Sequence, residues 1–350
     1  MVPSFVNLID LASERFGAAV VAANDEFFAP KDNLIRPEAP QWRQGEYTER
    51  GKWMDGWETR RRREAGDDWC IIRLGVAGIV RGVDVETTHF KGNYPEACAI
   101  DVASVSVSND SCDSYESYVV SGFSRTSDDM SSSTSSARWT EILPRTPLEG
   151  DTHNLFAVGA AIAATHVRLR IFPDGGVARL RVYGDVVPDW DRLRRRGEID
   201  LAAAEHGGIV VACSDMCFGS RHNLIMPGDA RNMGDGWETK RRRGPGHDWT
   251  IVRLGAPGTI SRADVDTRHF KGNAPGACSL EACAMEGATS DLVAGPGIEW
   301  RELVPRRALQ PHVRHTFDDD VQAVGEVTHV RFNIFPDGGV GRLRLFGKLR

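Results

Sequence analysis

Two short polar motifs, each present twice, contain the residue types that acid–base chemistry on a small anion requires. The first motif, Asp-Gly-Trp-Glu-Thr-Arg/Lys-Arg, occupies residues 55–61 and 235–241. The second, His-Phe-Lys-Gly-Asn, occupies residues 89–93 and 269–273. Arginine and lysine bind carboxylates, glutamate and histidine transfer protons, and asparagine hydrogen-bonds amide groups. The two motifs together therefore predict a site that binds an anionic substrate and moves protons.

Each motif residue has a predicted role that follows from its side chain. A guanidinium group can hold a carboxylate with two hydrogen bonds, and a lysine adds a point charge. Histidine titrates near neutral pH, and burial can raise the pKa of a glutamate toward that range. The candidate acid or base residues are Glu58, His89, Glu238 and His269. The candidate substrate-binding residues are Arg60, Arg61, Lys91, Asn93, Lys240, Arg241, Lys271 and Asn273.

The same residues also have structural interpretations. The arginines could form surface ion pairs along an edge strand, and Trp57 and Trp237 are more typical of core anchors than of ligand-stacking residues. A single histidine is often only a hydrogen-bonded structural residue, but His89 recurs inside an identical pentapeptide, which favours a function. Two copies also share residues that maintain the fold, as in the repeated Pro-Asp-Gly-Gly turns. We therefore leave Asp174 and Asp337 out of the candidate site.

Strands are expected to position the second motif. The apolar run at 69–74 is typical of a buried strand, and residues 80–90 alternate between two faces. In a regular strand, side chains two positions apart point to the same side. We therefore expect His89, Lys91 and Asn93 to share one face, where a cleft could form.

The end of each repeat predicts more β structure. Residues 166–172 and 177–183 flank a Pro-Asp-Gly-Gly sequence, which predicts a hairpin with a tight turn. Helical patterns are confined to residues 6–16 and their copy at 199–205. These features predict an all-β chain whose domains are antiparallel jelly-roll β-sandwiches with short N-terminal and linker helices.

The chain is an internal duplication. Residues 55–93 and 235–273 are identical at 24 of 39 positions, and residues 165–184 and 328–347 at 15 of 20. Such copies are too long to be solenoid repeats and indicate two domains of one fold.

The spacing between matching residues places the domain boundaries and the insertions. We expect a first domain at 1–186, a linker at 187–197 and a second domain at 198–350. The first copy carries extra residues around 41–52 and a serine-rich insertion around 108–137. The linker contains a run of arginines and is expected to include a short helix with a solvated face.

Composition excludes several classes of protein. The net charge of -6 argues against a nucleic-acid partner despite the local arginine runs. No stretch of 18 apolar residues is present, so no membrane association is expected. The N-terminus lacks the pattern of a secretory signal, and the seven cysteines show no disulfide spacing. We therefore expect a cytoplasmic protein.

The motifs also carry a resemblance. The segment Val-Arg-Leu through Arg-Leu-Arg-Val-Tyr-Gly at 167–184 resembles discoidin-type, galactose-binding-like jelly rolls. The paired Asp-Gly-Trp-Glu-Thr and His-Phe-Lys-Gly-Asn motifs are similar to those of the allantoicase family, and the similarity extends from about Ala22 to Gly347. The resemblance implies hydrolysis of allantoate to ureidoglycolate and urea in purine catabolism, and a homo-oligomer.

Release of intact urea requires breaking the bond between the α carbon and a ureido nitrogen. One ureido group leaves after protonation while the other donates its lone pair, and water then adds to the iminium carbon with help from a base. A serine or cysteine nucleophile is not required, and no Gly-x-Ser-x-Gly sequence is present.

Several alternatives remain at this level. Tandem discoidin-like domains could bind a carbohydrate or an anion without catalysis, or serve only in assembly, because fold does not determine function. No metal ligands are predicted; a divalent ion such as manganese could bind His89 with Glu86, but regular alternation places these residues on opposite faces. The sequence allows one site per repeat or a composite site.

Overall fold

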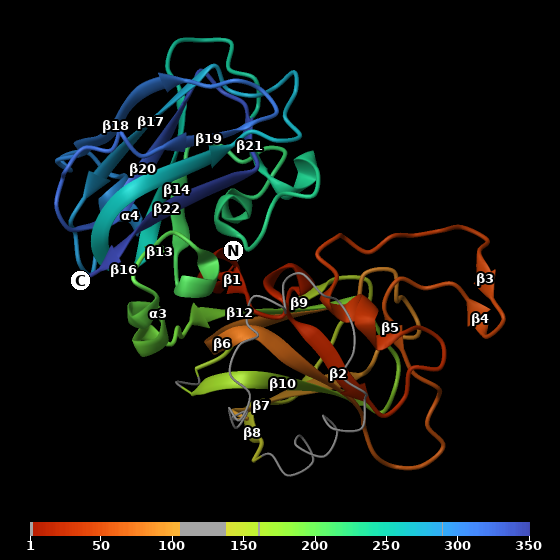
Figure 1. Ribbon diagram of the computed structural model, residues 1–350. Coiled ribbons are helices and arrows are strands. Elements are labelled where there is room, and N and C mark those ends of the chain that lie inside the picture. Colours follow the sequence, from red (N-terminus) through yellow and green to blue (C-terminus); the bar gives the residue numbers. More distant parts are fainter. Residues whose placement is uncertain (1–2, 106–137, 160–161, 289) are drawn as a thin grey trace. The chain divides into compact units, whose positions relative to one another are not determined.

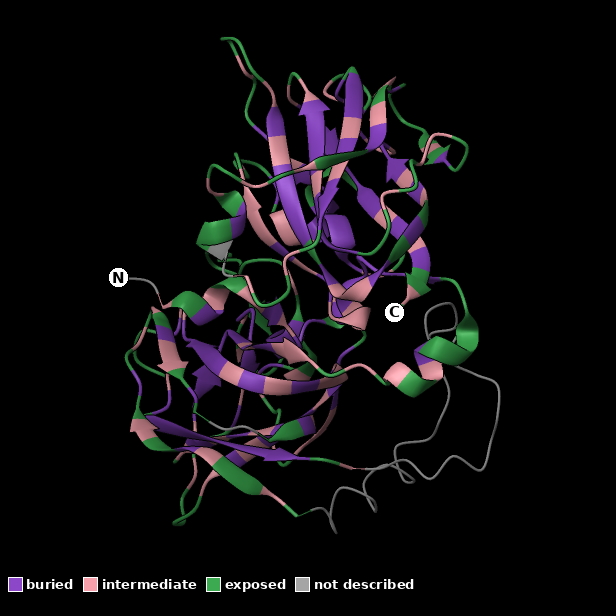
Figure 2. Ribbon diagram, turned by 90° about the vertical axis from the view of Figure 1, so that its left-hand side faces the viewer, coloured by how far each residue is buried: buried purple, intermediate pink, exposed green. Residues whose placement is uncertain are grey.

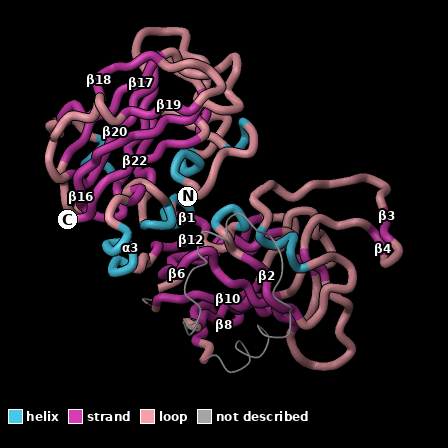
Figure 3. Tube along the Cα trace, viewed as in Figure 1, coloured by secondary structure: helices cyan, strands magenta, loops and turns pink. Residues whose placement is uncertain are grey.

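A computed structural model describes residues 3–105, 138–159, 162–288 and 290–350 (Figure 1). The chain forms two compact units, Met1–Val187 and Pro188–Arg350, and both consist mainly of strands (Figure 3). The all-β prediction is thus confirmed. The serine-rich insertion at 108–137 lies outside the described residues.

The first unit contains twelve described strands and three short 3-10 helices. The helices are η1 (Ser4–Asn7), η2 (Glu14–Phe16) and η3 (Lys31–Ile35). The strands are β1 (Ile9–Asp10), β2 (Ala19–Ala23), β3 (Tyr47–Thr48), β4 (Gly51–Lys52), β5 (Trp57–Glu58), β6 (Asp68–Glu86), β7 (Ala97–Ala103), β8 (Thr140–Pro147), β9 (His153–Ala157), β10 (Ala163–Phe172), β11 (Gly176–Val177) and β12 (Arg179–Val186).

The second unit repeats this order after a short helix. Its helices are α3 (Trp190–Arg196), η4 (Ala204–His206), η5 (Arg221–Ile225), η6 (Met233–Asp235) and α4 (Ser290–Ala294). Its strands are β13 (Ile199–Asp200), β14 (Ile209–Cys213), β15 (Trp237–Glu238), β16 (Asp248–Asp266), β17 (Ala277–Cys283), β18 (Arg301–Ala308), β19 (Arg314–Phe317), β20 (Val327–Phe335), β21 (Gly339–Val340) and β22 (Arg342–Leu349).

One long strand organises each domain. The first half of β6 pairs with β10 and β2, and its second half pairs with β12 and β9. The sheet order is β1-β12-β6-β10-β7-β8, and β16 takes the same place in the second domain. Because β6 takes part in both halves of the jelly roll, the loop that follows its C-terminal end is anchored by two sets of strands.

Three sequence-based predictions require correction. The predicted strands at 69–74 and 80–90 form one 19-residue strand that ends at Glu86. The predicted hairpin does not form, because β10 and β12 both pair with β6 and not with each other. The predicted helix at 6–16 contains only the 3-10 turns η1 and η2 around strand β1. The helix expected in the linker is present as α3.

Apolar and polar side chains alternate along the strands, and the apolar ones fill the core. Figure 2 shows buried segments alternating with less buried ones along several strands. In β10, Val167, Leu169 and Ile171 are fully buried, whereas Arg168 and Arg170 lie on the opposite face. Both of these arginines donate from Nε to Oδ2 of Asp101, at 2.9 and 2.8 Å. Apolar burial on one face and shared ion pairing on the other thus fix the register of the central strands.

Two buried histidines make stability depend on pH. Burial, assisted by nearby arginines, lowers the pKa of His166 and of His329 from 6.5 to about 4. The unfolded chain takes up these protons below pH 6.5, so stability falls as the pH decreases toward 4, by up to about 3 kcal/mol per histidine. Thermal melts should show this loss, and a His166→Gln/His329→Gln variant should show less of it. An unchanged pH dependence in that variant would contradict the assignment.

Candidate active site

A two-residue ladder places the candidate glutamate in each domain. Strand β5 pairs with β11, so that Trp57 faces Val177 and Glu58 faces Gly176. The Trp57 side chain is fully buried, and its Nε1 donates to the carbonyl oxygen of Asp25 at 2.7 Å. Trp237 makes the same bond to Asp215 at 2.8 Å. Both tryptophans are core anchors, as predicted, and they fix the glutamates that follow them.

The second motif packs directly on this ladder. Phe90 is fully buried, and a Cβ on Gly176 would lie only 2.0 Å from its ring. A Cβ on Gly56 would likewise approach the Phe90 ring to 2.8 Å. The amide of Gly176 donates to the carbonyl oxygen of Asn93 at 2.8 Å. The glycines of the first motif and of the Pro-Asp-Gly-Gly turn are therefore needed so that all three repeated motifs can meet.

This convergence joins a candidate base to a candidate amide. Asn93 Nδ2 donates to Oε1 of Glu58 at 2.7 Å, and Asn273 donates to Glu238 at 2.6 Å. Burial raises the pKa of Glu58, and the bond from Asn93 opposes this shift by favouring the carboxylate. The structure thus brings the predicted Glu and Asn residues together in both repeats.

His89 lies in a turn, not on a strand. Its φ of 73° and the 74° of His269 are left-handed values that only glycine adopts without strain. The prediction that His89, Lys91 and Asn93 share a strand face is therefore wrong, because β6 ends three residues earlier. Non-glycine residues in this conformation occur preferentially at functional sites, and here both copies of one histidine adopt it.

The surroundings of His89 fix its tautomer. Nε2 lies 3.2 Å from the carbonyl oxygen of Pro40, and Nε2 of His269 lies 2.8 Å from that of Ala230. A carbonyl oxygen only accepts hydrogen bonds, so Nε2 must carry the proton and Nδ1 presents a lone pair. In the described residues, Nδ1 of His89 makes no hydrogen bond. Each imidazole is therefore arranged to accept a proton at Nδ1.

The first repeat places a tryptophan ring beside its histidine. Trp42, from the insertion at 41–52, lies 5.6 Å from the His89 ring, measured between centroids. Lys52 Nζ lies 3.9 Å above the Trp42 ring. The insertion folds into the β3–β4 hairpin, which brings Lys52 over Trp42.

Most candidate cations of the first repeat are held by a carboxylate. Arg60 Nε donates to Oδ2 of Asp25 at 2.6 Å, and Lys91 Nζ lies 3.5 Å from Asp151. Arg61 is exposed and makes no ion pair or hydrogen bond with the described residues. Of the predicted clamp residues, Arg61 is thus the one most available to a ligand.

In the second repeat one candidate cation is paired, and a small cavity lies beside it. Lys240 Nζ lies 3.6 Å from Oδ2 of Asp215, whereas Arg241 and Lys271 are exposed and make no ion pair with the described residues. A cavity of about 330 Å³ is lined by Ser214, Asp215, Lys240, Arg241, Arg242, Arg243, Gly244 and Asp248. Its lining is strongly basic, which suits an anion.

Two buried arginines outside the repeated candidate motifs support these loops. Arg179 and Arg342 are each almost completely buried. Arg179 Nη2 donates to Oδ2 of Asp55 at 2.9 Å, its Nη1 to the Asp55 carbonyl at 3.0 Å and its Nε to the Glu38 carbonyl at 3.0 Å. The guanidinium therefore ties the loop before β5 to the first motif. The alternation of polar and apolar residues along β12 does not reveal that this loop folds over the strand.

Glu86 and His89 are two potential metal ligands in the described part of the chain. There, no group of three or more His, Cys, Asp or Glu side chains could hold a metal ion. Glu86 accepts from Thr88 Oγ1 at 2.7 Å, whereas His89 turns toward Pro40. Glu86 and His89, the two residues considered for manganese, thus bind different partners and not a common site.

A family profile matches both halves of the chain. The profile described as the allantoicase repeat covers residues 9–187 and 199–350. The chain belongs to the allantoicase family. A probable allantoicase of Photobacterium profundum is 47% identical over 98% of this chain and 97% of its own length. Another, of Pseudomonas aeruginosa, is 48% identical over 98% of this chain and 96% of its own length.

A solved allantoicase shares the architecture. The crystal structure of allantoicase from Saccharomyces cerevisiae matches with a TM-score of 0.77 and 35% identity, covering 97% of this chain and 92% of that one. Among the described residues of this family member, no helix is long and apolar enough to cross a membrane.

Proposed function

We propose that this member of the allantoicase family hydrolyses allantoate to ureidoglycolate and urea by acid–base cleavage of the Cα–N bond. The observation that carries the mechanism is the arrangement found in both repeats. A carboxylate held by an asparagine, Glu58 with Asn93, is built into the same loop junction as His89, whose Nδ1 is free. Family membership supports the substrate and the reaction.

The two side chains have complementary tasks in this mechanism. Departure of one ureido group leaves positive charge on the remaining C=N unit, and the Glu58 carboxylate stabilises that charge. Nδ1 of His89 takes a proton from the water that adds to the carbon. Asn93 orients Glu58 and favours its ionised form. The corresponding residues Glu238 and His269 have matching hydrogen-bond partners in the second repeat.

The substrate carboxylate requires a cation that is not already paired. We propose that Arg61 and its copy Arg241 provide it, with Arg60 and Lys240 held beside them by Asp25 and Asp215. A planar guanidinium matches a carboxylate better than an ammonium does. Lys91 and Lys271 are exposed and add positive charge nearby.

The first test is urea release from allantoate by the purified chain, with and without EDTA treatment. Equal amounts of urea and ureidoglycolate support the proposal, and the EDTA arm shows whether a divalent ion such as manganese is needed. Ammonia in place of urea would indicate a different ureide hydrolysis. No product, even after divalent ions are restored, would favour the alternative of a tandem discoidin-like module that binds a carbohydrate or an anion.

Replacing His89 by alanine is expected to lower kcat about 100-fold, the usual contribution of one general base. The matched change His269→Ala tests the second repeat, and the double variant shows whether the two sites are independent. Steady-state urea release measures all three. Turnover that stays at the wild-type level in both single variants and in the double variant would remove these histidines from the mechanism.

Composition supports the proposed location of the enzyme, and the family resemblance supports an oligomer. We propose a cytoplasmic homo-oligomer that acts on a small anionic ureide and has no nucleic-acid partner. Among the described residues, six cysteines are free and four of these are buried, which is compatible with a reducing compartment. Light scattering of the purified protein measures the oligomeric state directly.

A further inference from the structure

The mechanism above still needs an acid. The leaving ureido nitrogen must be protonated, yet His89 already uses its Nε2–H on the Pro40 carbonyl. Glu58, held by Asn93, acts in this mechanism as the carboxylate that stabilises positive charge, so it does not also supply the proton. A proton donor must therefore come from another residue beside this site.

His153 is such a residue, and the sequence motifs do not contain it. It begins strand β9 and lies opposite Glu86, the last residue of β6. Two residues earlier, Asp151 Oδ1 accepts the backbone N–H of His89 at 2.8 Å. Thr88, beside His89, donates to Glu86 at 2.7 Å. Two short contacts thus connect His153 to the His89 turn.

Buried carboxylates flank the His153 ring on both sides. Nδ1 lies 2.7 Å from Oδ2 of Asp84, and Nε2 lies 3.7 Å from Oε1 of Glu86. The second distance is too long for a hydrogen bond, so the Nε2 proton is not committed to Glu86. The histidine side chain is 60% exposed, whereas Asp84 is only 6% exposed. The His153 ring therefore rests on two buried carboxylates and exposes its Nε2–H to solvent.

The charges around this ring favour its protonated form. Partial burial lowers the pKa of His153. The hydrogen bond that its ring donates to Asp84 and the charges of Asp84 and Glu86 outweigh this effect, despite Arg181, so that the pKa lies above 6.5. Burial also raises the pKa of Asp84, and in the described residues its Oδ1 has no hydrogen-bond partner. An imidazolium at this position compensates buried negative charge.

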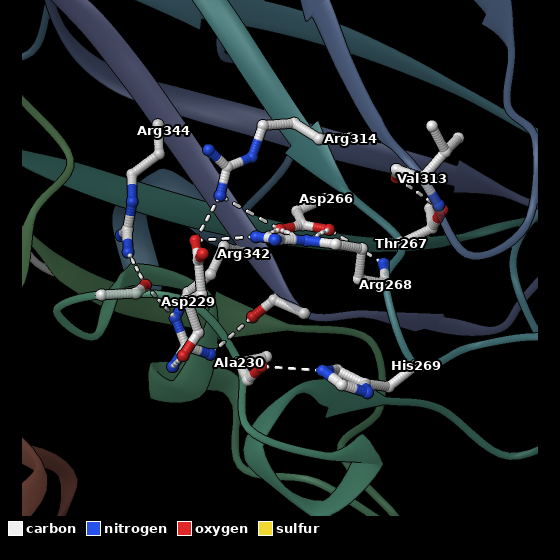
Figure 4. A network of polar contacts seen from close by, with 12 residues as sticks. Asp229, Ala230, Asp266, Thr267, Arg268, His269, Val313, Arg314, Arg342 and Arg344 are labelled. Atoms are coloured by element: carbon white, nitrogen blue, oxygen red, sulfur yellow. Dashed lines mark hydrogen bonds and ion pairs between the residues drawn. The ribbon is translucent and has the colours of Figure 1, made fainter.

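The second repeat replaces this titratable group by a fixed charge. Arg314 stands opposite Asp266, where His153 stands opposite Glu86 (Figure 4). Arg314 and Arg268 both bind Asp229 and Asp266. Guanidinium does not lose a proton at physiological pH. Asp229 accepts from both arginines of this network. Its counterpart in the first repeat is Ala39, which has no carboxylate, so among the described residues no matching ion pair covers His153.

We propose that His153 is the proton donor of the first-repeat site, and that the second repeat, with Arg314 in its place, is not an equivalent catalytic centre. This inference rests on the proposed function. Nε2 of the imidazolium gives its proton to the leaving ureido nitrogen, and the Cα–N electron pair departs with urea. The other ureido nitrogen forms the C=N bond, water adds to that carbon, and His89 accepts the water proton. Exchange with solvent returns both histidines to their starting states.

The test is urea release by His153→Gln over a range of pH. We expect kcat to fall about 100-fold. In the wild type, kcat/KM should decline as the pH rises through the raised pKa of His153, and this alkaline limb should be absent in the variant. The matched variant in the second repeat, Arg314→Gln, should keep kcat within about threefold of wild type.

A second variant keeps the inference testable if His153→Gln folds poorly. Asp84→Asn removes one flanking charge, so the alkaline limb should move to lower pH while His153 remains. Wild-type turnover by His153→Gln, or an unmoved limb in Asp84→Asn, would overturn the assignment. A loss in Arg314→Gln as large as that in His153→Gln would overturn the difference between repeats. Absence of urea release by the wild-type protein would instead refute the proposed function.

Discussion

Glu58→Gln is expected to lower kcat for allantoate about 100- to 1,000-fold while leaving the fold intact. The change preserves the shape of the side chain but removes the negative charge that would stabilise the developing iminium. Loss of one preorganised electrostatic contact to a transition state has effects of this size. Asn93, which now donates to Oε1 of Glu58 at 2.7 Å, could still bond the new amide oxygen, so the structural cost is small.

The measurement is kcat and kcat/KM for urea release between about pH 5 and pH 9. Burial raises the pKa of Glu58, so wild-type activity should decline as the pH falls through that raised value, where the carboxylate becomes protonated. The variant should lack this acidic limb. Glu26→Gln, which removes an exposed carboxylate paired with Lys31, is the matched control and should retain activity. A variant with a full acidic limb would contradict the role of Glu58.

The local motifs predicted the types of the site residues but not how they are held. Repetition of Asp-Gly-Trp-Glu and His-Phe-Lys-Gly-Asn was sufficient to select Glu58 and Asn93, which the structure joins. The period-two assumption failed at His89, because whether a strand continues or turns depends on the left-handed φ at that residue and on the contact of the neighbouring Phe90 with Gly176. These are tertiary features without a local pattern.

Long-range pairing explains the other differences. The Pro-Asp-Gly-Gly sequence has the composition of a hairpin turn, yet its glycines serve the Phe90 contact, and the flanking strands each pair with β6. His153 was not selected because it is not itself repeated: Arg314 occupies the matching position. A search for shared residues between copies cannot find a residue whose importance lies in the difference between them.

Arg179→Met is expected to destabilise the first domain by about 3–5 kcal/mol, the usual cost of removing one partner from a buried ion pair. Asp55 is buried, and Arg179 binds both its carboxylate and its carbonyl oxygen. Methionine fills similar space but leaves that charge with only the Gln41 amide at 2.9 Å and the more distant, half-exposed Arg36 at 3.7 Å. Urea unfolding monitored by tryptophan fluorescence measures the loss.

The pH dependence of that loss identifies its cause. In the wild type, burial raises the pKa of Asp55, but the bonds from Arg179 and Gln41 outweigh it, so the folded pKa lies below 3.8. This contribution is present above the unfolded pKa and disappears as the pH falls through the folded one. In the variant the buried carboxylate gains a raised pKa, and the deficit should shrink as acid neutralises it. Arg81→Met, which breaks an exposed pair with Asp185, should cost under about 1 kcal/mol at any pH. A deficit in Arg179→Met that stays constant with pH would point to lost packing instead of an uncompensated charge.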